Sequence, residues 1–226
     1  MRAKTAFAAS LALFAGSALA ASIVGSKHDL SSANTAGIHN TETTQICIFC
    51  HTPHNPMGMP LWNRIPPPRD PATYDLVQES ETLSAAASGA RLGSSSPSML
   101  CLSCHDGTLD EIGSRLRYGP VGGVLPLDMV DPLGTWGTSG MLWDGACVSN
   151  HPVGFDYASA QAEHPTRLRP VADVNVAFGS NVFYRGTDTN TLMECGTCHT
   201  THDPANPPFL RKSNSNNALC LACHVR

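Results

Sequence analysis

Aromatic and charged side chains are scarce in this sequence of 226 residues, of which they make up 6% and 14%. Acidic residues outnumber basic ones by 18 to 14, so a basic surface of the kind that binds nucleic acid is not expected. Glycine (19) and proline (17) are plentiful, whereas the sequence has no long helical period and few alternating strands. Protein side chains alone therefore predict a poor hydrophobic core, and we expect another group to supply the apolar mass.

Beyond its first residues the chain also lacks a run of about 20 apolar residues, the length that spans a bilayer. The beginning has basic Arg2 and Lys4, then an apolar run, then the small-residue sequence ALA. This pattern is typical of a secretory signal peptide over residues 1–20, with a membrane anchor as the alternative. Its removal would leave 12 basic and 18 acidic residues, a formal charge of −6.

Cysteine, by contrast, is abundant and regularly spaced. Eight of the nine cysteines form four C-x-x-C pairs, each followed directly by histidine: Cys47, Cys50 and His51; Cys101, Cys104 and His105; Cys195, Cys198 and His199; Cys220, Cys223 and His224. C-x-x-C-H is the attachment sequence for c-type haem, in which the thiols form thioethers with the porphyrin vinyl groups and the imidazole binds the iron. We therefore expect four covalently attached haem c groups.

Other uses of cysteine fit this pattern less well. A disulfide framework is the usual expectation for an exported protein, but it does not require histidine after every pair. Zinc sites use C-x-x-C pairs without needing histidine at the next position each time, and a thioredoxin-like pair occurs once, near a βαβ pattern. The ninth cysteine, Cys147, is interpreted as a buried thiol, with an intermolecular disulfide as the alternative.

The chain is a degenerate duplication. CIFCHTPHNPMGMPLWNR, which starts at Cys47, aligns with CGTCHTTHDPANPPFLRK, which starts at Cys195, and SMLCLSCH aligns with NALCLACH. The expected organisation is a signal peptide (1–20), a first dihaem half (21–118) with an insert at about 65–95, a glycine-rich linker (119–146) and a second dihaem half (147–226). The insert is interpreted as surface decoration with one short helix over 74–90, or alternatively as a binding loop.

Each half also supplies four histidines, the number that two haems need for both axial positions. Besides the proximal histidines of the four motifs, the predicted distal ligands are His54 and His202, each three residues after a proximal histidine, and His28 and His151, which precede the first motif of each half. These ligands use eight of the ten histidines, and the remaining two, His39 and His164, are reserve candidates. The count predicts bis-histidine ligation without an open coordination site.

The second histidine of each C-H-x-x-H sequence points away from the proximal one, because three residues along a helical turn change the direction of the side chain. We expect His54 and His202 to reach a neighbouring haem and so to hold two porphyrins close together. Imidazole on both faces gives lower reduction potentials than an axial methionine. The methionines near the motifs are the competing ligands, although methionine more often fills gaps in a core: Met57, Met59, Met99 and Met141.

The four motifs, the segments CIFCHTPHN and CLSCHDGT, NHPVGFDY before the third motif and FLR…NALCLACH at the end resemble the doubled-CxxCH multihaem cytochromes. Within that group, the size and motif count resemble the extracellular tetrahaem cytochromes that polymerise into nanowires, the OmcE-like type. The resemblance implies a loop-rich, mostly irregular protein with short α-helices and little β-sheet, wrapped around a stack of four haems. It also implies a homopolymer in which one histidine crosses each subunit junction, and His28 is the residue expected to cross.

Three functions are compatible with these features. The first is an electron conductor, the subunit of an extracellular filament that passes electrons to external acceptors. The second is a monomeric periplasmic carrier that serves redox partner proteins, and the third is a multihaem reductase with one open haem. All four motifs keep their histidine and the ligand count leaves no iron open, so we expect electron transfer without catalysis. The expected location is extracellular or on the outer surface, with the periplasm as the alternative.

Overall fold

The computed structural model describes residues 22–51, 83, 92, 96–105, 117–118, 123–124, 129–130, 151–186 and 189–226. Several sequence-based expectations lie outside these residues: the signal peptide, most of the insert with its helix, most of the linker, His54, Cys147, Met57, Met59 and Met141. The remaining predicted ligands and all eight motif cysteines lie within them.

Within the described residues the protein is mostly irregular, with short helices and three two-residue strand pairs. The helices are η1 (Cys47–Phe49), α2 (Pro97–His105), α3 (Tyr157–Glu163), α4 (Val171–Phe178), α5 (Cys195–Cys198), η6 (Ser215–Asn217) and α6 (Cys220–Cys223). The strand pairs, all antiparallel, are β1 (His39–Asn40) with β4 (Met129–Val130), β2 (Arg117–Tyr118) with β3 (Gly123–Val124) and β5 (Phe155–Asp156) with β6 (Leu192–Met193). The expected loop-rich fold with short helices and little sheet is confirmed.

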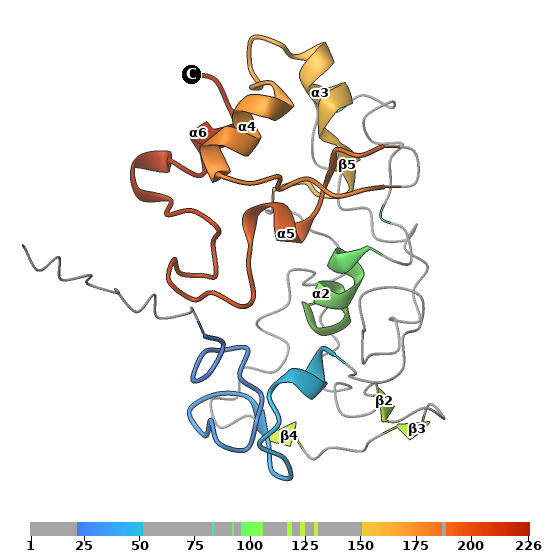
Figure 1. Cartoon of the computed structure of the whole chain (residues 1–226), viewed down its shortest axis with the longest axis vertical. Helices are drawn as coiled ribbons and strands as arrows, with labels where there is room; N and C mark the ends of the chain where they lie inside the picture. Colours follow the sequence, from blue (N-terminus) through green and yellow to red (C-terminus); the bar gives the residue numbers. More distant parts are fainter. Residues whose placement is uncertain are drawn as a thin grey trace, which may run out of the picture.

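The second half of the chain forms one end of the molecule, where α3, α4 and α6 lie together, and the N-terminal segment forms the other end (Figure 1). Helices α2 and α5 lie between the two ends and pack against each other. The helix of the second motif thus contacts the helix of the third, although they belong to different halves of the sequence. This central contact brings the two halves together.

Each described C-x-x-C pair lies on a short helical segment, which places its two thiols one turn apart on the same side. In α5 and α6 the helix ends directly after the second cysteine. The next residues, His199 and His224, are extended, and each N–H donates back to the first cysteine of its motif. The chain therefore leaves the helix at the proximal histidine, and its imidazole is free to point in a different direction from the thiols.

The hydrophobic core is divided into small clusters. The larger one is made of buried residues between α3, α4 and the β5–β6 pair: Phe155, Tyr157, Ala160, Val174, Val182, Phe183 and Met193. A second cluster between α2 and β6 contains Leu102, Leu192 and Met99, which is 4% exposed. Met99, one of the competing ligands, is thus a packing residue of α2.

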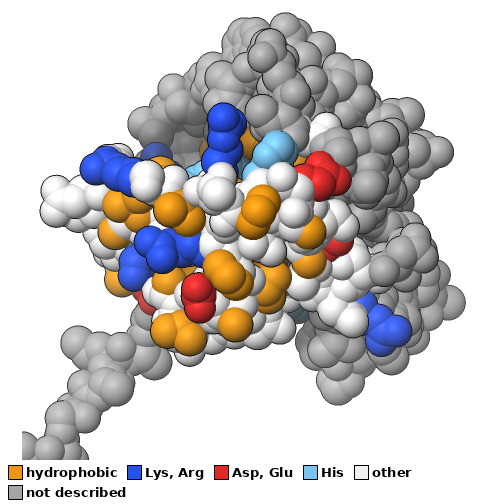
Figure 2. Space-filling view, turned by 90° about the horizontal axis from the view of Figure 1, so that it is seen from above, with side chains coloured by type: hydrophobic (Ala, Val, Ile, Leu, Met, Phe, Trp, Pro, Cys, Tyr) orange, Lys and Arg blue, Asp and Glu red, His pale blue; other side chains and the backbone are white. Residues whose placement is uncertain are grey.

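No helix among the described residues is long and apolar enough to cross a membrane. On the face seen in Figure 2, hydrophobic side chains (orange) are interspersed with polar ones, and histidine (pale blue) reaches the surface beside basic side chains (blue). Among the proximal and predicted distal histidines that the structure describes, the exposed residues are His151, His202 and His224, and the half-buried ones are His28, His51, His105 and His199.

Candidate functional site

None of the eight motif cysteines forms a disulfide in the structure. Thiols of different motifs lie close together. The side chains of Cys101 and Cys195 hydrogen bond to each other, an interaction that raises the pKa of Cys101 and lowers that of Cys195. Cys198 of the third motif interacts electrostatically with Cys220 of the fourth, and the pKa of Cys198, raised to about 11, reflects first its burial and then its cysteine neighbours. The third motif is thus adjacent to both the second and the fourth.

Within the part of the chain that the structure describes, three pairs of histidine rings face each other at nearly the same distance. The ring centroids are 6.1 Å apart for His28 and His105, 6.1 Å for His51 and His202, and 6.2 Å for His151 and His224. Two imidazoles on opposite sides of one metal ion have centroids about 6.3 Å apart, since each metal–nitrogen bond is about 2.0–2.1 Å long and the nitrogen lies just over about 1 Å from its ring centroid. Each pair joins one proximal histidine to one predicted distal histidine and could hold one iron between its rings.

His28 lies in a largely apolar setting beside the proximal histidine of the second motif. Its ring centroid is 4.4 Å from that of Phe209, and its buried Nδ1 has no hydrogen-bond partner among the described residues. Burial, followed by repulsion from His105 and the histidines of the third motif, lowers its pKa to about 4. The ring is therefore neutral at pH 7, the form that binds a metal. Its contact with His105 favours a ligand within the same chain over one donated to a neighbouring subunit.

His202 faces the first motif rather than its own. Its ring is within 19° of parallel to that of His51, which belongs to the other half of the chain. His54, the counterpart of His202 in the first half, lies outside the described residues. Nδ1 of the His199 ring donates a hydrogen bond to the carbonyl oxygen of Pro208, at 3.0 Å, in the tautomer that carries its proton there. Such a bond to Nδ1 orients the ring and leaves Nε2 for a metal.

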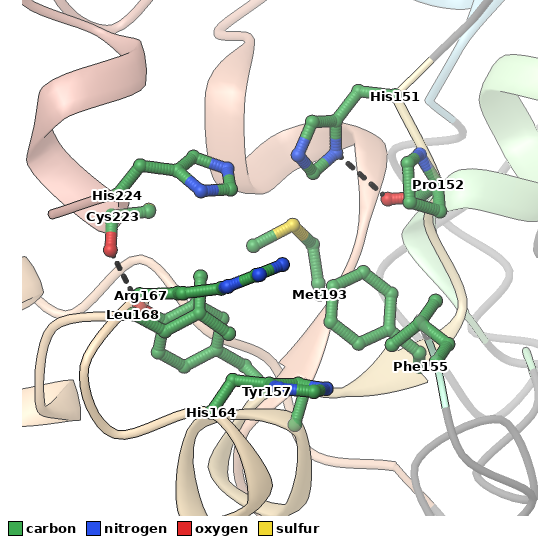
Figure 3. A pocket seen from close by; sticks show the side chains of 12 residues that line it. His151, Pro152, Phe155, Tyr157, His164, Arg167, Leu168, Met193, Cys223 and His224 are labelled. Atoms are coloured by element: carbon green, nitrogen blue, oxygen red, sulfur yellow. Dashed lines mark hydrogen bonds between the residues drawn. The ribbon is translucent and has the colours of Figure 1, made fainter. Parts of the chain in front are cut away.

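His151 and His224 face each other beside a cavity of about 200 Å³ (Figure 3). Nδ1 of His151 lies 2.9 Å from the carbonyl oxygen of Pro152, which again leaves Nε2 available. The cavity is lined mainly by apolar side chains, with Arg167 and His164 as its further polar members: Leu83, His151, Pro152, Phe155, Tyr157, Ala160, His164, Arg167, Leu168, Met193, Cys223 and His224. An apolar cavity beside two opposed imidazoles and a cysteine fits a porphyrin held at its iron and at one edge.

The two reserve histidines lie in different settings. His39 belongs to β1, and its Nδ1 lies 2.7 Å from the carbonyl oxygen of Gly37. His164 follows α3 and lines the cavity beside His151 and His224. Their role as reserve ligands stays a prediction.

Sequence reasoning missed Glu194, which joins the second and third motifs. This residue is 1% exposed, and its Oε2 accepts hydrogen bonds from Ser96 Oγ (2.6 Å), Ser98 N (2.9 Å) and Ser98 Oγ (3.0 Å) at the start of α2. It also caps α5 together with Thr197, and Ser98 Oγ accepts from the N–H of Cys195 at 2.9 Å. Burial raises the pKa of Glu194, and the hydrogen bonds oppose that shift only in part.

The only sequence signal for this network was a carboxylate directly before one motif and two serines shortly before another. Ser, Thr and Glu at such positions are typical of helix N-termini, but nothing in the sequence says that one carboxylate serves two helices. The structure shows that it does. Glu194 therefore fixes the separation of the helices that carry the second and third motifs.

Each described motif has two thiols followed by an imidazole, the donor set for covalent attachment of haem c. Residues 190–226, which contain the third and fourth motifs, match the protein-family model described as doubled CXXCH motif. No curated protein matches the chain. The family match supports a doubled-CxxCH multihaem c-type cytochrome that takes part in electron transfer.

Proposed function

We propose that the protein is a tetrahaem electron-transfer cytochrome in which each iron is held between two imidazoles. The observation that carries this proposal is the equal spacing of three ring pairs, 6.1, 6.1 and 6.2 Å between centroids, at the distance that one metal ion imposes. Bound haem c would accept and release one electron at its iron without a change of axial ligand. The chain supplies the covalent anchors, the axial imidazoles and the shell that sets the separation of the haems.

The ligand sets follow from the pairs. We assign His28 and His105 to the second motif, His51 and His202 to the first, and His151 and His224 to the fourth. His199 remains for the third motif, and His54, by the symmetry of the repeat, is its proposed partner. His54 of the first half would then bind the iron of the third motif, and His202 of the second half would bind the iron of the first motif. All eight ligands would come from one chain.

The third motif supports electron transfer between the halves, because it lies next to the others. His202, three residues after His199, faces His51 of the first motif, and three residues span at most about 11 Å. The thiols of Cys101 and Cys195 are in contact, and Cys198 interacts with Cys220 and Cys223. Since each thiol would be bonded to the edge of its own porphyrin, these contacts give short routes from the third haem to its neighbours.

A conductive extracellular filament is the finer form of the same function. The resemblance to nanowire subunits supports it. In the ligand assignment above, His28 pairs with His105 of its own chain, whose ring centroid is 6.1 Å away, so a polymer would join subunits whose own ligand sets are complete. A discrete carrier uses the same ligands and needs no subunit contact. A reductase would need an iron with an open side, whereas three of the four irons would have an imidazole on each side.

The exported holoprotein tests the proposal directly. Intact-mass measurement should give four haem c groups per chain, the absorbance spectrum should be that of low-spin iron, and the reduced protein should not bind carbon monoxide. Fewer than four attached haems, or carbon monoxide binding at wild-type irons, would disprove the tetrahaem bis-histidine assignment. Electron microscopy of the same sample at high concentration then distinguishes a filament subunit from a discrete carrier.

A further inference from the structure

Among the described residues that line the cavity beside His151 and His224, Arg167 has the one cationic side chain apart from the histidines. This side chain extends into the cavity below the two facing imidazoles (Figure 3). The same described lining includes no carboxylate, and most of its other side chains are apolar. A guanidinium presents several N–H donors in a plane and pairs best with a carboxylate or phosphate. The cavity therefore offers a binding position for an anionic group.

The backbone around Arg167 is tied to the fourth motif. Its N–H donates to the carbonyl oxygen of His164 (2.9 Å), and its own carbonyl oxygen accepts from Val225 (2.8 Å), the residue after His224. The next residue, Leu168, forms an isolated antiparallel bridge with His224. Arg169 adds a hydrogen bond from its N–H to the carbonyl oxygen of Cys223 (2.8 Å). Arg167 thus has a fixed position relative to the proximal histidine and the second thiol of this motif.

The second thiol of the same motif, Cys223, also lines the cavity. A porphyrin bonded to this thiol, with its iron between His151 and His224, would lie beside the cavity that Arg167 enters. Haem c carries two propionates, which are ionised at pH 7. Among the described side chains that line the cavity, Arg167 is the cationic one that such a propionate could bind.

We propose that Arg167 binds a propionate of the haem c attached at Cys220 and Cys223. This inference rests on the proposed function, because it needs a haem between His151 and His224. A guanidinium near the iron stabilises the reduced form, which carries one positive charge less than the oxidised form. Arg167 is accordingly a positioning residue that raises the reduction potential of this haem and keeps its propionate ionised.

The test compares Arg167→Gln and Arg167→Lys with a matched control, Arg185→Gln, in the haem-loaded protein. Arg185 is also an exposed arginine of the second half but does not line the cavity. We expect Arg167→Gln to keep four haems and a low-spin spectrum, to move one midpoint potential to a lower value, and to make that potential more dependent on pH. Arg167→Lys should restore most of the wild-type potential, and Arg185→Gln should leave all potentials unchanged.

Resonance Raman spectra provide a readout that a purely structural role would not move, because the propionate bending mode shifts when its hydrogen-bond donor is removed. If Arg167→Gln gives the same potentials and the same propionate band as Arg185→Gln, the inference is wrong. If Arg167→Gln fails to load haem, the test rests on Arg167→Lys. Its propionate band should differ from that of wild type because the donor is different, and an unchanged band would show that the inference is wrong. A failure of the proposed function is recognised by a different variant, His151→Ala. If His151 is not an axial ligand, every iron in this variant stays low-spin.

Discussion

The imidazoles of His51 and His202 lie 6.1 Å apart between ring centroids and within 19° of parallel, although they belong to opposite halves of the duplicated chain. The other two facing pairs are close to perpendicular, at 79° for His28 and His105 and 72° for His151 and His224. The repeat therefore produces two kinds of imidazole pair. One links the two halves, and the other joins an upstream histidine to the second motif of its own half.

The first prediction concerns the electronic difference between these kinds of pair. Each imidazole interacts through its π orbital with one of two iron d orbitals that are otherwise equal in energy. Parallel rings act on the same orbital and separate the two energies, whereas perpendicular rings act on one each and leave them nearly equal. Electron paramagnetic resonance of the oxidised protein should therefore show both a rhombic low-spin signal and a strongly anisotropic one.

A variant assigns the rhombic signal. His202→Met replaces one ring of the parallel pair, so we expect the rhombic signal to lose intensity and one reduction potential to rise, because an axial thioether favours the reduced iron. His39→Met is the control, since His39 lies in β1 and faces no motif histidine. A rhombic signal that survives His202→Met at full intensity would contradict the pairing of His51 with His202.

The second prediction separates a ligand within the chain from one given to a neighbouring subunit. His28→Ala should leave four haems attached, because the thiols are unchanged, but one iron should become accessible and bind carbon monoxide after reduction. The wild-type spectrum should not change on dilution, because His28 faces His105 of its own chain. An open iron that appears on dilution of the wild type would instead indicate that the ligand comes from another subunit.

The sequence predicted the motif helices and the irregular fold because both depend on local features. C-x-x-C within one turn places two thiols together, and many prolines and glycines prevent long helices. Helices α3 and α4 were not predicted, although Asp156 caps α3, Pro170 precedes α4, and Gly179 follows α4 with φ 72°. These signals are weak without knowledge of the packing that makes such short helices stable.

The relationships that the sequence did not predict join residues far apart in the chain. The expectation that His28 crosses to another subunit stays a prediction, but its contacts with Phe209 and His105 were not expected from the sequence. Glu194 was overlooked because its partners are distant in the sequence: Ser96 lies directly before α2 and Ser98 in its first turn. Such contacts depend on how the two halves of the chain pack against each other, and the local patterns of a single sequence do not predict this packing.

The third prediction concerns Asp156, which begins α3. Burial would raise its pKa, but hydrogen bonds from Ser159, Thr189 and Thr191 outweigh that effect, and the pKa is lowered. A lowered pKa means that the ionised form stabilises the fold above the unfolded pKa of about 3.9, and that this contribution is lost as the pH falls further. At pH 7, Asp156→Asn should reduce the free energy of unfolding by about 1–3 kcal/mol.

Thermal unfolding of the holoprotein at several pH values measures this effect. The difference in melting temperature between wild type and Asp156→Asn should be largest near neutral pH and should shrink below about pH 4. Asp173→Asn is the matched control, because Asp173 is exposed in the first turn of α4. A difference that stays constant through the acidic range would show that the charge of Asp156 contributes nothing to the stability of α3.

The last prediction concerns Glu194, whose pH dependence should have the opposite sign. Its pKa is raised by burial, so the native protein holds the proton at pH values where the unfolded chain, with a pKa near the ordinary 4.5, has already lost it. The stability that this proton provides is complete below the unfolded pKa and is lost as the pH rises through the folded one. Glu194→Gln carries no such charge, so its melting temperature should rise relative to wild type as the pH increases from about 4.5.

Glu194→Ala separates the charge from the hydrogen bonds. It removes the acceptor shared by Ser96 and Ser98 and leaves buried donors at the start of α2, at a cost of about 1–3 kcal/mol for each unsatisfied group. Because α2 and α5 carry the second and third motifs, this variant should also shift the potentials of two haems, whereas Glu194→Gln should shift them less. If both variants unfold like wild type at every pH and leave all potentials unchanged, Glu194 does not hold the two helices together.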